Sequence, residues 1–300
     1  MRHCGVTGQV LKGETPPVQG LQIIKTKRTS NQVFAVSVVR QIQPHPAGLR
    51  APATLIEASD GHVYQVAFPA DPEYLNLQFN QAMGAELYSA VGLPVQRWAP
   101  LAVTREFIER HQAFWMNGDK AWTPAEGLYF ASRFPFSGRQ SVWWEVLPAS
   151  WIELIENRTA FALAWLVDIC AQNTSSRRAI FREIEGRYSA TFIMRGTMFG
   201  GPRGDQDPWM GASLYWDPHI YCGLKRPEID RNWTRTIRKN VELKFRHVPS
   251  QWHTPSAIAR LSLCLERLSD PALLDRIWSC MMDCLASGAG ASRTESYGQV

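Results

Sequence analysis

The residues best able to do chemistry gather in the stretch Asp168–Gly200 and in the loop that follows it. Carboxylate oxygens are the ligands that Mg²⁺ prefers in proteins, so Asp205 and Asp207 are the candidate metal ligands of this region. Asp168 is the candidate for a catalytic acid or base, whereas the hydroxyl of Ser175 has neither the charge nor the pKa for that role. The simpler interpretation makes Asp168 a brace or cap for a loop and the other two acids solvated.

The order of motifs along the chain resembles that of the HipA-like and phosphatidylinositol 4-kinase-like family, from about Val38 to Asp283. In that family a catalytic loop reads Asn-x-Asp followed by Arg, and a later strand ends in Ile-Asp before a Gly and a Phe. This chain has Asn173-Thr174-Ser175 followed by Arg177, and its strand ends in Ile193-Met194. The frame of the loop is present, but both acids are replaced.

The resemblance implies an α+β, bilobal protein-kinase-like fold with an antiparallel β-rich N-lobe and a mainly helical C-lobe. The N-lobe and hinge are expected at residues 31–136 and the C-lobe at residues 137–287. Residues 1–30 read as a flexible arm, and residues 288–300 as a disordered tail of small and polar residues.

Local patterns predict the elements that would hold these residues in place. A strand is expected from Gln32 to Gln41, a hairpin over Ala53–Phe68 turning at Asp60-Gly61, and a helix that Gly92 and Pro94 stop. An apolar helix should deliver Asp168. Three further helix starts are predicted by a capping box at Ser150 and Glu153 and by N-cap and proline pairs at Thr254-Pro255 and Asp270-Pro271.

Four positions at which the family carries charged catalytic groups hold uncharged residues here. The phosphate-binding Lys corresponds to Ala67, and the Glu that pairs with it corresponds to Gln81. The catalytic Asp corresponds to Ser175 and the metal-binding Asp to Met194. A methyl group cannot neutralise a phosphate, and a thioether is a poor ligand for a hard cation. The two changes at Ala67 and Gln81 are mutually consistent, since a buried Glu without its Lys would be an uncompensated charge.

The resemblance also names residues that would contact a nucleotide. The segment 127–134 is similar to the family's Gly-x-x-Phe-x-Ser-Arg-Phe strand, which leads into a hinge that presents backbone groups to adenine. Ser132, Arg133 and Phe134 of that segment, together with Asn173, are the nucleotide-binding candidates. ATP and Mg²⁺ are the cofactors that the family implies, and the missing charges put both in question.

Three functions remain open from the sequence. The leading one is a pseudokinase that binds or regulates a protein partner. The second is an active, atypical kinase for Ser/Thr or a small molecule, in which Asp168 or the pair Asp205 and Asp207 replaces the missing acids. The third is a nucleic-acid-associated regulator, because family members pair with DNA-binding antitoxins and the basic segment Lys225–His247 could contact phosphates. A solvated helix face is the simpler interpretation of that segment.

Composition narrows the setting of the protein. The formal net charge is +5, and the chain of 300 residues can form one large domain or two lobes. The longest apolar run, around residues 160–171, contains Asp168 and is shorter than the roughly twenty residues of a membrane span. No membrane span and a cytoplasmic location are therefore expected. Neither an HExxH motif nor a GxSxG motif occurs, so hydrolase chemistry has no support.

Overall fold

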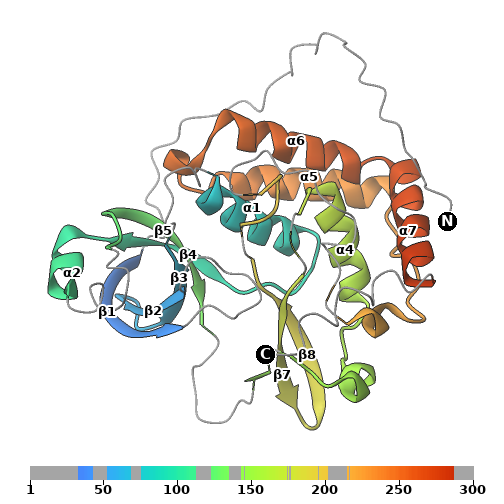
Figure 1. Cartoon of the computed structure of the whole chain (residues 1–300). Coiled ribbons are helices and arrows are strands. Elements are labelled where there is room, and N and C mark those ends of the chain that lie inside the picture. Colours follow the sequence, from blue (N-terminus) through green and yellow to red (C-terminus); the bar gives the residue numbers. More distant parts are fainter. Residues whose placement is uncertain are drawn as a thin grey trace, which may run out of the picture.

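The computed structural model describes most of the chain between residues 33 and 286 (Figure 1). The described ranges are 33–42, 53–68, 76–112, 123–134, 143–144, 146–173, 175, 177–194, 196–201, 215 and 217–286. The expected arm at residues 1–30, the expected tail at residues 288–300, and Asp205 and Asp207 lie outside them. Strands and helices occur together in the described residues, as expected for the α+β class.

Five strands close into a barrel in the order β1-β2-β3-β5-β4 (Figure 1). Their bounds are β1 Val33–Ile42, β2 Ala53–Ala58, β3 Val63–Ala67, β4 Trp98–Val103 and β5 Gly127–Arg133. Neighbouring strands are antiparallel, except that β1 closes the barrel through Val33 and Phe34 by pairing in parallel with β4. The predicted hairpin turns at Asp60 and Gly61, and Gly61 has φ +76°. The inward side chains of the barrel include Ile56, Val66, Phe68, Leu101 and Ala131.

A larger core joins the helices to each other. It involves α1 (Leu77–Ala90), α4 (Ala160–Cys170), α5 (Arg231–Phe245), α6 (Pro255–Leu268) and α7 (Pro271–Ala286). Helix α1 follows the barrel strand β3 in sequence, but its buried Phe79, Met83 and Leu87 belong to this larger core. The short helix α2 (Arg105–Arg110) instead places Phe107 in the barrel core. None of the helices among the described residues is long and apolar enough to cross a membrane.

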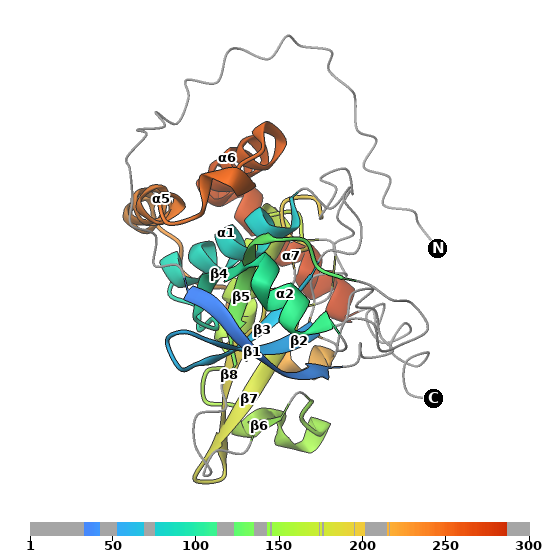
Figure 2. The ribbon, with the colours of Figure 1, turned by 90° about the vertical axis from the view of Figure 1, so that its left-hand side faces the viewer.

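A three-stranded antiparallel sheet extends below the helices in both views (Figures 1 and 2). It consists of β6 (Trp143–Trp144), β7 (Ala179–Ile184) and β8 (Arg187–Phe192). The turn between β7 and β8 lies at Glu185 and Gly186, and both residues have positive φ. The outer edge of β8 is covered, because Phe192 exchanges backbone hydrogen bonds with the chain around Val95 and Asn157 binds both backbone groups of Ala190.

Two of the predicted helix starts are confirmed and one is wrong. The Thr254 hydroxyl accepts a hydrogen bond from the backbone N–H of Ala257, at 3.2 Å, and Asp270 accepts one from that of Leu273, at 3.1 Å. The capping box predicted at Ser150 does not form. That segment is the 3₁₀ helix η1 (Ala149–Leu154), which has no side-chain cap.

The physical reason for the missing cap lies in the preceding and following residues. The helix is preceded by Pro148, which occupies the N-cap position and has no side-chain acceptor. Glu153, the expected partner of Ser150, forms an ion pair with Arg158 instead. The 3₁₀ helices η3 (Pro218–Tyr221) and η4 (Ser250–Trp252) complete the described elements.

Glu86 of α1 connects the barrel to the helical body. Its Oε1 accepts a hydrogen bond from the indole N–H of Trp98 on β4, at 3.0 Å, and its Oε2 lies 2.7 Å from Nζ of Lys244 on α5. Trp98 in turn stacks on Phe130 of β5 with ring centroids 5.4 Å apart, and lies near Trp252. The barrel is therefore attached to α1 and α5 by specific side-chain contacts.

His253 supplies a prediction about pH. Its ring lies 5.8 Å from that of Phe79 and 4.4 Å from that of Phe245. Burial lowers the pKa of His253 from 6.5, and a backbone hydrogen bond at Val248 opposes the shift. In the unfolded chain this imidazole takes up its proton at a higher pH than in the folded protein. The stability that comes from burying the neutral imidazole of His253 is therefore fully present above the pKa of the unfolded state. It is lost as the pH falls through the pKa of the folded state.

We expect His253→Phe to reduce the loss of thermal stability between pH 7 and pH 5, because Phe cannot take up the proton. Melting curves followed by circular dichroism at both pH values would measure this loss. Equal losses for His253→Phe and the wild type would contradict the assignment.

Candidate functional site

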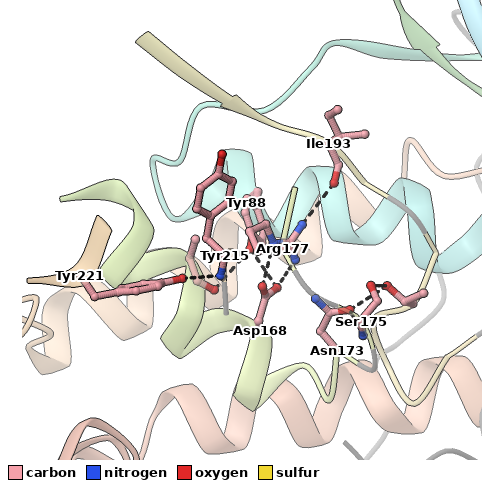
Figure 3. Close-up of polar contacts among 10 residues, drawn as sticks. Tyr88, Asp168, Asn173, Ser175, Arg177, Ile193, Tyr215 and Tyr221 are labelled. Atoms are coloured by element: carbon pink, nitrogen blue, oxygen red, sulfur yellow. Dashed lines mark hydrogen bonds and ion pairs between the residues drawn. The ribbon is translucent and has the colours of Figure 1, made fainter. Parts of the chain in front are cut away.

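Asp168 is the centre of a buried polar network at the end of α4 (Figure 3). Arg177 donates to both of its carboxylate oxygens, with Nε 2.7 Å from Oδ2. The hydroxyl of Tyr88 donates to Oδ1 at 2.8 Å, and the guanidinium of Arg177 lies 4.6 Å from the centre of the Tyr88 ring. Arg177 also donates to the carbonyl of Ile193, at 3.2 Å. One carboxylate thus ties together α1, α4 and the segment after β8.

The environment of Asp168 favours the bracing role over a role in chemistry. Burial raises the pKa of its carboxyl, while the charge of Arg177 and the hydrogen bonds from Arg177 and Tyr88 oppose that rise. Burial also raises the pKa of Tyr88 well above its ordinary value, so its hydroxyl remains a donor. Because Asp168 is 0% exposed and both of its oxygens are occupied, it can reach a metal or a substrate only by breaking the pair with Arg177.

The loop after α4 is held by a chain of neutral hydrogen bonds. Asn173 is buried, and its backbone N–H donates to the carbonyl of Asp168 at 2.8 Å. The side-chain oxygen of Asn173 accepts hydrogen bonds from the hydroxyl of Thr197, at 2.7 Å, and from the backbone N–H of Ser175. The hydroxyls of Ser175 and Thr197 lie 2.7 Å apart. Ser175, at the expected position of a catalytic base, is thus hydrogen-bonded to neutral side chains.

Met194, at the expected position of a metal ligand, is buried and packs against α1. A Cβ added at Gly84 would lie 3.1 Å from the sulfur of Met194 and 2.6 Å from that of Met198. The absence of a side chain at Gly84 therefore makes room for the two thioethers. Gln81 lies one helical turn earlier, and its Cγ is 3.2 Å from the place that a Cβ would take at Gly196.

Three of the four neutral positions are consequently brought to one junction. Gln81 and Met194 meet where α1 faces residues 193–201, and Ser175 joins the same segment through Thr197. These residues come from three distant parts of the chain. Ala67 is the exception, because it ends β3 and no described contact links it to this junction.

The α1 side of the junction carries buried amide atoms without partners among the described residues. They are Nε2 of Gln78, Oδ1 of Asn80 and Oε1 of Gln81. The other amide atom of Asn80 donates to the carbonyls of Gly196, at 3.2 Å, and Gly201, at 2.9 Å. Asn80 thereby holds the segment after β8 in place. In the sequence Asn80 only precedes Gln81, the position of the family's Glu, and this context did not predict its hydrogen bonds.

Tyr88 and Thr197 were also missed by sequence reasoning. Tyr88 was hidden within an ordinary apolar stripe of α1, where an aromatic residue is usually part of a core. Thr197 lies in the short segment between two recognised motif positions.

The predicted nucleotide-binding residues at the end of β5 form hydrogen bonds with other residues of the barrel and of the segment before β4. The hydroxyl of Ser132 donates to the side chain of Gln96 at 3.1 Å. The backbone N–H of Arg133 donates to the carbonyl of Arg97 at 2.7 Å, and that of Phe134 to the carbonyl of Val63 at 2.8 Å. These two donors are thus not free for adenine. Asn173, the fourth candidate, lies in the loop after α4.

The described residues contain no group of three or more His, Cys, Asp or Glu side chains that could hold a metal ion. Asp205 and Asp207 fall outside those residues, so their assignment as metal ligands stays a prediction. The junction of α1 with the loops at 171–177 and 193–201 is the candidate site, and its functional groups are amides, hydroxyls and thioethers. Comparisons with protein-family models, with curated proteins and with solved structures found no match for this chain.

Proposed function

We propose that the chain is a HipA-like kinase-fold protein that acts as a pseudokinase, binding or regulating a protein partner without transferring phosphate. The observation that carries this proposal is the meeting of Gln81, Ser175 and Met194 at one junction. In the family the position of Ser175 carries the catalytic Asp, that of Met194 the metal-binding Asp, and that of Gln81 the Glu that pairs with the phosphate-binding Lys. Their neutral replacements lie next to one another, so the losses affect one site rather than three unrelated places.

The four replacements should reduce the rate of phosphoryl transfer by a large factor. Phosphoryl transfer depends almost entirely on positioning and on the stabilisation of negative charge. Removing one preorganised charge-stabilising group typically costs about 10²–10³ in rate. A site without its Lys, its base and its metal ligand should therefore be nearly inert. The nearest buried acid, Asp168, is already paired with Arg177 and does not offer a replacement.

The arrangement of the strands is compatible with the proposal. Helix α1 is inserted between β3 and β4, and β5 leads out of the barrel toward the rest of the chain. A helix after the first strands is what the resemblance implies for an N-lobe, although the short α2 adds a second helix between β4 and β5. The five strands form a closed barrel in which β1 pairs in parallel with β4, whereas the resemblance implies an antiparallel N-lobe.

The first test is thermal stability against ATP concentration, with Mg²⁺ or with a chelator. A ligand of the native state at 100 times its Kd adds about 2.7 kcal/mol to the free energy of unfolding. We expect no Mg²⁺-dependent shift in melting temperature up to millimolar ATP. A clear shift that needs Mg²⁺ would overturn the proposal and favour an active kinase with relocated acids.

Restoring the missing charges provides a matched gain-of-function variant. In Ala67→Lys/Gln81→Glu/Ser175→Asp/Met194→Asp, we expect a Mg²⁺-dependent shift that the wild type lacks. Because Gln81 and Met194 are buried, this variant can lose stability, and Ala67→Lys/Ser175→Asp is the milder version. If both restored variants fold and neither responds to ATP, the four positions are not a former phosphate site.

A further inference from the structure

We propose that the exposed face of α5 binds the phosphate backbone of nucleic acid, independently of the kinase-like junction. The segment Arg231–Arg246 contains six basic residues and one acidic residue, a net charge of +5. The formal net charge of the whole chain is also +5, so the rest of the chain sums to zero. The excess positive charge of the protein is therefore concentrated on a single helix.

The helix presents this charge to solvent on one side. Its buried residues Ile237, Val241 and Phe245 recur every four positions and form the stripe that enters the larger core. The cationic face is defined by four exposed residues, Arg235, Arg238, Lys239 and Arg246. At about 100° per residue these four fall within a sector of roughly 100°. In Figure 2, α5 lies at the outer edge of the ribbon, away from the hairpin of β7 and β8.

The four cations are available for a ligand. None of them forms an ion pair or a hydrogen bond with another described residue, whereas Lys244 on the same helix is paired with Glu86. The face runs from residue 235 to residue 246, which at about 1.5 Å per residue is roughly 16 Å. Duplex DNA presents one phosphate per strand about every 3.4 Å along its axis, so this length can reach several phosphates.

The alternatives fit the face less well. A helix that binds a membrane surface inserts an apolar side, but the apolar side of α5 is buried against the core. Protein interfaces are centred on desolvated aromatic and aliphatic residues, and Leu243 is the one large apolar side chain that the described part of α5 exposes, at 46%. Backbone phosphates need only the cations, and Arg binds them with paired hydrogen bonds.

Glu242 gives the proposal a sharp internal test. It lies within the same sector of the helix as the cations and is exposed. Its carboxylate should repel phosphates, and it makes no described ion pair that its loss would disrupt. The variant Glu242→Gln should therefore bind nucleic acid more tightly than the wild type, an outcome that damage to the fold cannot produce.

The experiment measures fluorescence anisotropy of a labelled 20-base-pair DNA duplex with the full chain at 50, 100 and 200 mM NaCl. Four phosphate contacts predict a slope of log K against log salt of about −3.6, which is roughly a 100-fold loss of affinity over this range. Arg235→Gln/Arg238→Gln/Lys239→Gln/Arg246→Gln should abolish binding. Each single substitution should make the slope shallower by about 1.

The matched control removes the same amount of charge elsewhere. Four other exposed arginines lie on α2 and on the hairpin, and their quadruple variant is Arg105→Gln/Arg110→Gln/Arg182→Gln/Arg187→Gln. This control variant should keep most of the affinity of the wild type for the DNA duplex. Equal loss in both quadruple variants, no binding at 50 mM NaCl, or weaker binding by Glu242→Gln would each overturn the proposal. Binding to vesicles with 30% phosphatidylserine but not to DNA would also overturn it, in favour of a membrane surface.

Discussion

Asp168→Asn should lower the free energy of unfolding by about 3–5 kcal/mol, because it leaves the guanidinium of Arg177 buried without a counter-charge. The side chains of the pair are 0% and 5% exposed, so water cannot replace the lost partner. The substitution also weakens the hydrogen bond from Tyr88, since an amide oxygen is a poorer acceptor than a carboxylate. Urea unfolding followed by tryptophan fluorescence would measure the change.

Two further variants separate the bracing pair from a general effect of charge. Glu106→Gln removes an acid from the exposed pair with Arg110 on α2, and it should change stability by less than about 1 kcal/mol. The double variant Asp168→Leu/Arg177→Met should be less destabilised than the sum of the two single changes, because neither charge is then left alone. A cost below 1 kcal/mol for Asp168→Asn would show that the carboxylate is not a brace, and would reopen its role as a substitute acid.

Gly196→Ala should be destabilising by about 2–5 kcal/mol, the second large effect. Gly196 has φ +74°, a conformation that costs an L-residue roughly 1–2 kcal/mol. An added Cβ would also lie 2.4 Å from a methyl carbon of Leu77 and 3.1 Å from its carbonyl oxygen. Overpacking of this kind typically costs a further 1–3 kcal/mol. The segment after β8 would be pushed away from α1, and the candidate site would be disturbed.

The hairpin turn provides the control for backbone strain. Gly61 has φ +76°, close to that of Gly196, but a Cβ added there meets nothing within 4 Å. Gly61→Ala should therefore cost only the conformational part, about 1–2 kcal/mol. The difference between the two variants, measured by urea unfolding, isolates the close approach of the segment at Gly196 to α1. Equal costs would mean that α1 and this segment do not pack closely.

Local structure followed directly from local sequence at several places. The hairpin at Asp60 and Gly61 and the cap at Thr254 each depend on neighbouring residues, and both were predicted. The capping box at Ser150 failed because its partner, Glu153, pairs with Arg158 instead. Such competition between two partners for one side chain is not visible in the spacing alone.

The tertiary parts of the site were less predictable. The resemblance named Ser175 and Met194, and both lie beside α1 or the segment that α1 contacts. It did not reveal that Asn80 holds this segment, nor that Tyr88 completes the Asp168 network. Both contacts join residues about 80 or more positions apart, and their geometry is set by how α1 packs on the larger core. Closure of the barrel was also not predicted, because Val33 of β1 and Leu101 of β4 pair although they are far apart in the sequence.

The covered sheet edges restrict how another chain could attach to this protein. Every barrel strand has a neighbour on both sides, and the outer edge of β8 is occupied around Phe192 and Ala190. The opposite edge of that sheet is β6, which has only two residues. Free strand edges are the usual templates for aggregation and for binding by strand addition. In the described part of the chain, the closed barrel and the covered edge of β8 therefore leave fewer positions for an added strand than an open sheet would.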